Sequence, residues 1–137
     1  MPASKVRIFV VNDYPDFLEM VSELLSDEGY EVVTTPKHRD AFVQLKELQP
    51  DLLICDLIFD GTAEGWNLVD KAVLDPSTTN IPILICSAAT KQLQEAAGSL
   101  NAKGILWLEK PFTLDQLTEQ VELALKRRPR SSPPSST

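Results

Sequence analysis

Polar side chains that could do chemistry follow four short apolar runs of this sequence. Asn12 and Asp13 come directly after the first run, Asp56 after another, Ser87 after the next, and Lys110 closely follows the last. If two of these carboxylates met in one cleft they would repel each other, and a divalent cation would relieve that conflict. Oxygen donors favour Mg²⁺, while an ammonium group and a hydroxyl can hold the oxygens of a phosphoryl group. The set therefore predicts a carboxylate that accepts a phosphoryl group.

The apolar runs have the composition of strands in a parallel sheet. All but one are nearly continuous in aliphatic and β-branched residues, which is typical of strands covered on both faces, and the more polar second run suits an edge. A stretch of helical periodicity follows each run, which predicts an α/β fold with a doubly wound, five-stranded parallel sheet and five helices. Ligands of such folds bind at the carboxyl ends of the strands. The predicted strands are Val6–Val11, Glu31–Thr35, Leu52–Cys55, Ile83–Cys86 and Ile105–Leu108.

Capping residues and apolar spacing predict where the helices begin. Pro15 suits the first turn of the first helix, the third helix follows Gly65, and Thr90 begins the fourth. Thr113 and Gln116 form a capping box at the start of the fifth. The expected buried stripes are Phe17, Val21, Leu24 and Leu25 in the first helix, and Leu114, Leu117, Val121, Ala124 and Leu125 in the last.

Composition bounds the kind of protein and its partners. The chain has 137 residues and is 43% hydrophobic, which suits one folded domain, predicted over residues 1–128, with a disordered Ser/Pro-rich tail over 129–137. Four of the 13 basic residues lie beyond residue 125, so residues 1–125 carry 9 basic and 20 acidic side chains, a net charge of −11. Such a body repels nucleic acid. Without an apolar run of membrane-spanning length or a signal peptide, we expect a cytoplasmic protein.

Cysteine and histidine are too few for a thiol or zinc site. Cys55 and Cys86 lie within apolar runs, where buried, reduced thiols are expected. His38 is the single histidine, so a zinc ligand set cannot be assembled around it.

Taken together, these motifs resemble the receiver domain of two-component response regulators, of which the chemotaxis regulator is one. The resemblance extends from Lys5 to Arg128 and is carried by the strand-end residues together with Leu52–Leu57 (LLICDL) and Leu108–Phe112 (LEKPF). It implies a flavodoxin-like sheet with strand order 2-1-3-4-5. It also implies that Mg²⁺ is the cofactor and that the chain is not an enzyme, although it assists its own phosphoryl transfer and dephosphorylation.

The resemblance further implies a role for each site residue. Asp56 matches the phosphoryl acceptor, Asp13 a metal ligand, Ser87 the switch hydroxyl, Lys110 the phosphate-pairing lysine, and Trp107 the switch aromatic. Asn12 and the backbone carbonyl of Ile58 would complete the metal site, and the Lys110–Pro111 bond would be cis.

Partners also follow from this resemblance. A histidine kinase or phosphotransfer protein would act upstream and an effector protein downstream, with no direct nucleic acid or membrane contact. The effector face, on the fourth and fifth helices, would include Lys91, Gln94, Trp107 and Gln116, and the chain would be a monomer or a weak dimer through it.

The sequence departs from the receiver pattern at three places. Asn12 stands where receivers usually have an acid, which predicts weaker Mg²⁺ binding. The loop after Asp56 is longer and lacks the usual Met-Pro. Ile58 and Ala89, both apolar, occupy the positions that control access of water, which predicts a long-lived phosphoryl group.

Two other functions compete with a phosphorylated switch. The first is a pseudo-receiver that binds proteins without phosphorylation, which Asn12 and the unusual loop favour. The second is a phosphatase or flavin enzyme. Against it, Asp56 has no second Asp two residues on, and no phosphate-binding Gly-rich loop follows the first strand.

Overall fold

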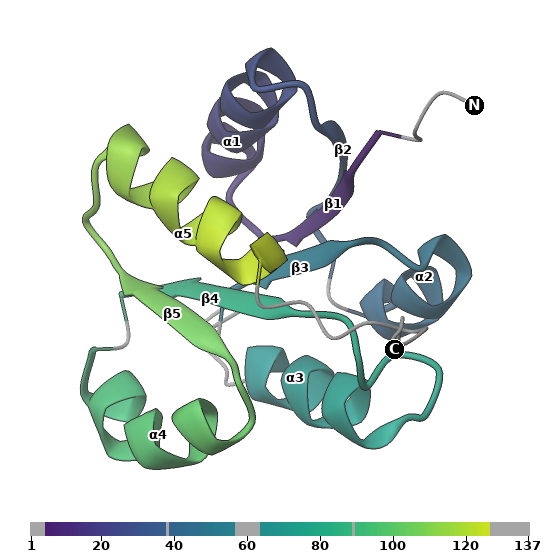
Figure 1. The fold of residues 1–137 in the computed structure, drawn as a ribbon, viewed down its shortest axis with the longest axis vertical. Helices are drawn as coiled ribbons and strands as arrows, with labels where there is room; N and C mark the ends of the chain where they lie inside the picture. Colours follow the sequence, from purple (N-terminus) through teal and green to yellow (C-terminus); the bar gives the residue numbers. More distant parts are fainter. Residues whose placement is uncertain (1–4, 38, 57–63, 89, 127–137) are drawn as a thin grey trace.

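The computed structural model describes residues 5–37, 39–56, 64–88 and 90–126. Strands and helices alternate strictly along the chain, and the strands form the centre of the molecule (Figure 1). The elements are β1 (Arg7–Val11), α1 (Pro15–Asp27), β2 (Glu31–Thr35), α2 (Ala41–Leu48), β3 (Leu52–Cys55), α3 (Glu64–Leu74), β4 (Ile83–Ser87), α4 (Thr90–Ala102), β5 (Leu106–Glu109) and α5 (Leu114–Lys126).

The five strands form one parallel sheet in the order β2-β1-β3-β4-β5, which confirms the predicted fold class and the polar edge strand β2. The order reverses at β1, so the carboxyl ends of β1 and β3 adjoin at the switch point where ligands of such sheets bind. In the register of these strands Val11 lies beside Cys55, so Asn12 and Asp56 leave the sheet side by side. Ser87 similarly lies beside Glu109 at the ends of β4 and β5.

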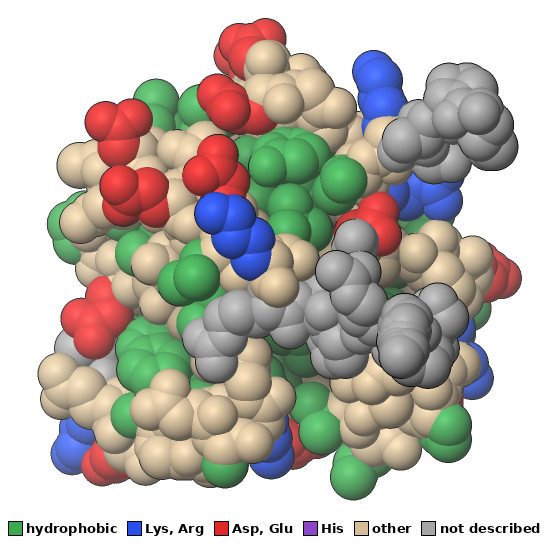
Figure 2. Space-filling model, viewed as in Figure 1, with side chains coloured by type: hydrophobic (Ala, Val, Ile, Leu, Met, Phe, Trp, Pro, Cys, Tyr) green, Lys and Arg blue, Asp and Glu red, His purple; other side chains and the backbone are tan. Residues whose placement is uncertain are grey.

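Helices cover both faces of the sheet: α1 and α5 lie on one face and α2, α3 and α4 on the other (Figure 1). The outer surfaces of α1 and α5 carry much of the negative charge, and Figure 2 shows red carboxylate side chains in the region of these helices. The exposed acidic residues of this layer are Asp16, Glu19, Glu23, Asp27, Glu28, Asp115, Glu119 and Glu122.

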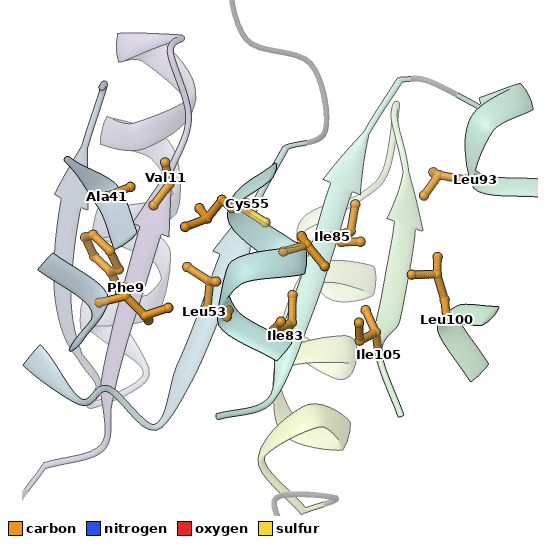
Figure 3. Packing of buried hydrophobic residues seen from close by; sticks show 14 residues of the cluster. Phe9, Val11, Ala41, Leu53, Cys55, Ile83, Ile85, Leu93, Leu100 and Ile105 are labelled. Atoms are coloured by element: carbon orange, nitrogen blue, oxygen red, sulfur yellow. The ribbon is translucent and has the colours of Figure 1, made fainter. Parts of the chain in front are cut away.

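Alternate residues of each central strand belong to different halves of the core. In β1, Ile8 packs toward α1 and α5, whereas Phe9 packs toward the other three helices, because successive strand side chains point to opposite faces. Figure 3 shows the cluster that includes Phe9: Phe9 and Val11 of β1 lie beside Ala41 of α2, and Ile85 and Ile105 lie toward Leu93 and Leu100 of α4. Each fully buried aliphatic side chain contributes about 1.5–3 kcal/mol to the stability of the fold that positions the strand ends.

The capping box at the start of α5 is confirmed. The Gln116 side chain accepts a hydrogen bond from the Thr113 backbone N–H at 2.8 Å, and the Thr113 hydroxyl accepts one from the Gln116 N–H at 3.1 Å. The predicted stripes, however, were partly wrong. Leu114 is 47% exposed because it lies in the first turn, at the end of the packed layer. In α1 the buried residues are Leu18, Val21 and Leu25.

Several element limits shift by one residue from the prediction. The first strand begins at Arg7 rather than Val6, the fourth extends to Ser87, and the fifth runs from Leu106 to Glu109. The third helix begins at Glu64, one residue before Gly65. The strand limits shift because the hydrogen bonds between strands, and not the composition of an apolar run, decide where a strand begins and ends.

The structure also tests what was expected of the two thiols, of the Lys110–Pro111 peptide bond and of helices that could span a membrane. Cys55 and Cys86 are free and buried, as predicted, and the Lys110–Pro111 bond is cis. Among the described residues, the helices are all too short or too polar to span a bilayer. His38 and the tail over 129–137 lie outside the described residues, as does the predicted boundary after residue 128.

Candidate functional site

The carboxyl ends of β1, β3, β4 and β5 surround a cleft of about 390 Å³. The cleft is polar because the chain leaves the apolar sheet at this edge. The polar groups of the residues that follow each strand must then contact water or form hydrogen bonds. The structure brings the strand-end residues predicted to share a site into this one cleft. It is lined by Asn12, Asp13, Tyr14, Asp56, Ser87, Ala88 and Lys110.

The main ion pair of the cleft joins residues 54 positions apart in the sequence. Lys110 Nζ donates a hydrogen bond to Asp56 Oδ2 at 2.9 Å. The Asp56 side chain is 11% exposed and that of Lys110 is 26% exposed, so water screens their attraction only in part. The backbone N–H of Lys110 also donates to the Ser87 carbonyl at 2.9 Å, which holds the start of this segment against the end of β4.

Two aromatic rings complete the surroundings of Lys110. Its Nζ lies 4.6 Å from the centroid of the Phe17 ring, and Phe17 meets Phe112 edge to face, with centroids 6.3 Å apart. Sequence reasoning assigned Phe17 only to a buried stripe of α1. An aromatic in an amphipathic helix has the same signature whether it packs or faces a cation, so spacing alone could not distinguish the two.

Asn12 is 2% exposed and its amide has a defined orientation. Its Oδ1 accepts a hydrogen bond from the Tyr14 backbone N–H at 2.8 Å, which identifies the other amide atom as the nitrogen. This Nδ2 is buried and has no hydrogen-bond partner among the described residues. An amide nitrogen cannot ligate a cation, so Asn12 can offer a metal or its bound water only the remaining lone pair of Oδ1.

The oxygen donors of the cleft suit a hard cation, although only two of the described lining side chains are carboxylates. Asp13 and Asp56 both present carboxylates to the cleft, and such oxygens are the ligands that Mg²⁺ prefers. Within the part of the chain that the structure describes, three or more His, Cys, Asp or Glu residues do not come together as a metal cluster. Ile58, whose carbonyl was expected to be a third ligand, lies outside that part, and so does Ala89.

The predicted switch residues differ in their surroundings. Ser87 is fully buried at the end of β4, within the cleft. Trp107 lies in β5, half-buried against the core on the side of α2, α3 and α4, and does not line the cleft. Of the expected effector face, Lys91, Gln94 and Gln116 are exposed.

The two buried thiols take no part in the chemistry of the cleft. Burial raises the pKa of Cys86 to about 12, with the Lys110 ammonium opposing that shift and the Asp56 carboxylate adding to it. Burial likewise raises the pKa of Cys55. Both thiols therefore stay protonated near neutral pH and supply neither a nucleophile nor a metal ligand.

Comparison with known proteins gives one consistent family. The sequence model of the response regulator receiver domain matches residues 8–122. The DNA-binding response regulator MtrA of Mycolicibacterium smegmatis is 28% identical over 127 residues, which are 93% of this chain and 54% of MtrA. The chain thus spans about half the length of this relative.

Solved structures agree with the fold. A protein of Chloroflexus aurantiacus, described as a response regulator, is 30% identical with a TM-score of 0.78, covering 90% of this chain and 100% of that one. The receiver domain of the sensor histidine kinase PA1611 from Pseudomonas aeruginosa has a magnesium ion coordinated in its active-site cleft. It is 18% identical with a TM-score of 0.75, and the match covers 90% of this chain and 99% of that one. This second likeness concerns the fold alone.

Proposed function

Because this chain belongs to the response regulator receiver domain family, we propose that it is a signalling switch that accepts a phosphoryl group on Asp56. The observation that carries the proposal is the contact of Lys110 Nζ with Asp56 Oδ2 at 2.9 Å, in a cleft shared with Asp13 and Ser87. A carboxylate placed beside an ammonium and a buried hydroxyl has what it needs to receive a phosphoryl group.

The transfer is an in-line displacement at phosphorus. A carboxylate oxygen of Asp56 forms the new O–P bond, and the bond from phosphorus to the donor, a phosphohistidine or acetyl phosphate, breaks with its electron pair leaving on the donor. The Lys110 ammonium then pairs with the phosphoryl oxygens, which carry the charge that the carboxylate loses. The Ser87 hydroxyl donates a hydrogen bond to the same group.

Mg²⁺ is the proposed cofactor; Asp13 and Asp56 would hold it, and the receiver resemblance implies Asn12 and the Ile58 carbonyl as further donors. When bound, it would neutralise charge on the transferring phosphoryl group. Two carboxylates in one small cleft support this proposal, because they would otherwise repel each other. Asn12 contributes an amide where an acid would add a charge, so the proposed affinity for Mg²⁺ is weak.

Signalling would follow from a shift between two populated conformations. Ser87 ends β4, which precedes α4 with its exposed Lys91 and Gln94. Trp107 lies in β5, which precedes α5 with its exposed Gln116. We propose that a histidine kinase or phosphotransfer protein transfers the phosphoryl group to Asp56. An effector protein would then bind the face formed by α4 and α5, and the chain would be a monomer or a weak dimer through the same face. MtrA is described as DNA-binding, but the net negative charge here supports protein partners.

Intact mass spectrometry after incubation with acetyl phosphate and Mg²⁺ tests the proposal. We expect one phosphoryl adduct on the wild type and none on Asp56→Asn, which keeps the shape of the side chain but cannot form an acyl phosphate. Asp51→Asn is the matched control, since Asp51 precedes the same strand at its opposite end, and it should keep the adduct.

The pseudo-receiver is the second candidate, and the amide at Asn12 favours it because it removes one charge from the cation site. The same experiment separates the two functions. A wild type that gains no mass at saturating Mg²⁺ and acetyl phosphate, while remaining folded, would establish the pseudo-receiver instead.

A further inference from the structure

We propose that Phe17 is a positioning residue for Lys110, whose ring face keeps the ammonium within reach of both the Asp56 carboxylate and an incoming phosphoryl group. This inference rests on the proposed function and deepens it. It assigns a part in the phosphoryl site to an aromatic residue of α1 that does not line the cleft.

The geometry is that of a cation–π contact. Lys110 Nζ lies 4.6 Å from the centroid of the Phe17 ring and at the same time 2.9 Å from Asp56 Oδ2. The attraction of an ammonium to a ring is effective within about 6 Å and grows as the cation loses water. Because 74% of the Lys110 side chain is shielded from solvent (it is 26% exposed), the contact is stronger than its counterpart on an open surface.

The Phe17 ring is placed by its position in the first turn of α1 and packs against one other aromatic ring. Pro15 begins α1 and sets the first turn in which Phe17 lies, directly after the strand that ends in the cleft. Phe112 packs against Phe17 at an interplanar angle of 83° and follows Lys110 by two residues. The segment after β5 thus supplies both the Lys110 ammonium and the Phe112 ring, which packs against the Phe17 ring that the ammonium contacts.

A ring face has a particular advantage beside a moving ammonium. Lys110 must leave Asp56 Oδ2 for the phosphoryl oxygens, to which its N–H groups would donate. A carboxylate at position 17 would compete for those donors and retain the cation. An aromatic ring attracts the cation through its quadrupole and consumes no lone pair, so it supports both positions of the ammonium.

Packing alone does not explain the placement of Phe17. The buried positions of α1 are Leu18, Val21 and Leu25, and Phe17 lies beside that stripe, only partly buried. A residue needed only for packing could be Leu at this position. What a ring adds to that packing is a face toward the Lys110 ammonium.

Fluorinated phenylalanines at position 17 test this directly. One, two and three ring fluorines withdraw charge from the ring face in steps, while the size of the side chain barely changes. With acetyl phosphate as the probe, the initial rate of adduct formation on Asp56 should fall with each fluorine, to about a fifth of the wild-type rate at three. Phe17→Leu should show a similar loss, and Phe17→Tyr should keep most of the rate. A rate that is flat across the fluorinated series overturns the proposal.

Phe112→Leu is the matched control, because it removes the same volume from the aromatic pair and leaves the ring near the cation. We expect a smaller loss of rate than for Phe17→Leu; an equal loss would show that packing is responsible and would overturn the inference. Thermal unfolding of each variant verifies that it is folded. If the wild type itself gains no phosphoryl group, the proposed function fails; if it does and the fluorinated series is flat, only the role of Phe17 fails.

Discussion

The molecule contains two sets of lysine, aspartate and phenylalanine at opposite ends of the sheet, and they differ in burial and in local partners. At the amino ends of the strands, Lys46 Nζ lies 3.5 Å from Asp75 Oδ2 and 5.4 Å from the centroid of the Phe42 ring. The Lys46 side chain is 46% exposed, so solvent screens the pair. At the carboxyl ends, the corresponding distances of Lys110 are 2.9 Å and 4.6 Å, and both charged groups are more buried.

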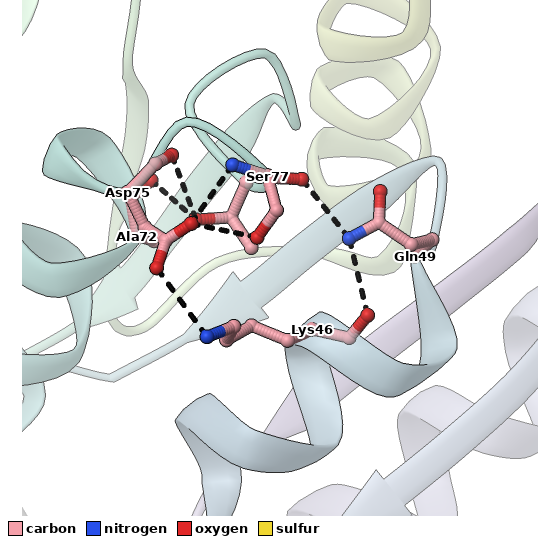
Figure 4. A network of polar contacts seen from close by, with 6 residues as sticks. Lys46, Gln49, Ala72, Asp75 and Ser77 are labelled. Atoms are coloured by element: carbon pink, nitrogen blue, oxygen red, sulfur yellow. Dashed lines mark hydrogen bonds and ion pairs between the residues drawn. The ribbon is translucent and has the colours of Figure 1, made fainter.

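Local hydrogen bonds account for much of this difference. Asp75 accepts bonds from both the N–H and the hydroxyl of Ser77, at 2.8 and 2.7 Å, which closes a turn before β4. Gln49 reaches the Ser77 carbonyl at 3.0 Å, so the loop is tied to α2 (Figure 4). A sequence neighbour, Ser77, thus makes the short hydrogen bonds to Asp75, whereas Lys110, which donates to Asp56, comes from 54 residues away. Identical residue types therefore support a loop in one place and line the proposed phosphoryl site in the other.

Exchange of each lysine for alanine gives the largest expected contrast. Lys110→Ala should slow phosphorylation of Asp56 by acetyl phosphate about 100-fold, because it removes the cation that would pair with the phosphoryl oxygens. Lys46→Ala should leave the rate unchanged and lower the free energy of unfolding by less than about 1 kcal/mol, as for other exposed ion pairs. The rate of adduct formation by mass spectrometry measures the first effect and urea unfolding the second. Equal rates in the two variants would remove the distinction between the two ends.

A single added carboxylate should change the affinity for Mg²⁺ at the carboxyl ends of the strands but not at their amino ends. Asn12→Asp should raise the affinity for Mg²⁺ about tenfold, because it places another negative charge beside the cation. Asn80→Asp adds the same charge on the exposed loop before β4 and should leave the affinity unchanged. Titration of Mg²⁺ followed by the fluorescence of the two tryptophans measures both. A wild type and an Asn12→Asp variant that both ignore Mg²⁺ would contradict the proposed metal site.

The smallest expected effect concerns the pH dependence of Asp75. The hydrogen bonds from Ser77, and the nearby Lys46 ammonium, lower its pKa below the ordinary value of 3.8. A lowered pKa in the folded state stabilises the fold above 3.8, and that contribution is lost as the pH falls through the folded value. Asp75→Asn should therefore be less stable than the wild type at neutral pH, and the gap should close in acid. Urea unfolding over a pH series measures the gap, and a gap that persists in strong acid would contradict this account. Phosphorylation should not change.

Local sequence determined the elements and the polar strand ends of this protein. The capping box of Thr113, the proline that begins α1 and the continuous apolar strands act over a few residues, so they can be identified without knowing what lies nearby. The same strand ends, together with the topology implied by the resemblance, were enough to predict that Asp13, Asp56 and Lys110 share a cleft.

Tertiary structure alone decided which partners these side chains have. Helical spacing placed Phe17 and Leu114 in buried stripes, yet the first lies against an ammonium and the second is about half exposed. Periodicity specifies a face of a helix, but the residues opposite that face depend on strand order, register and the angle at which the helix packs. The sequence also treats Lys46 and Lys110 alike, and only the packing of distant segments encloses Lys110 beside Asp56 and leaves Lys46 about half exposed.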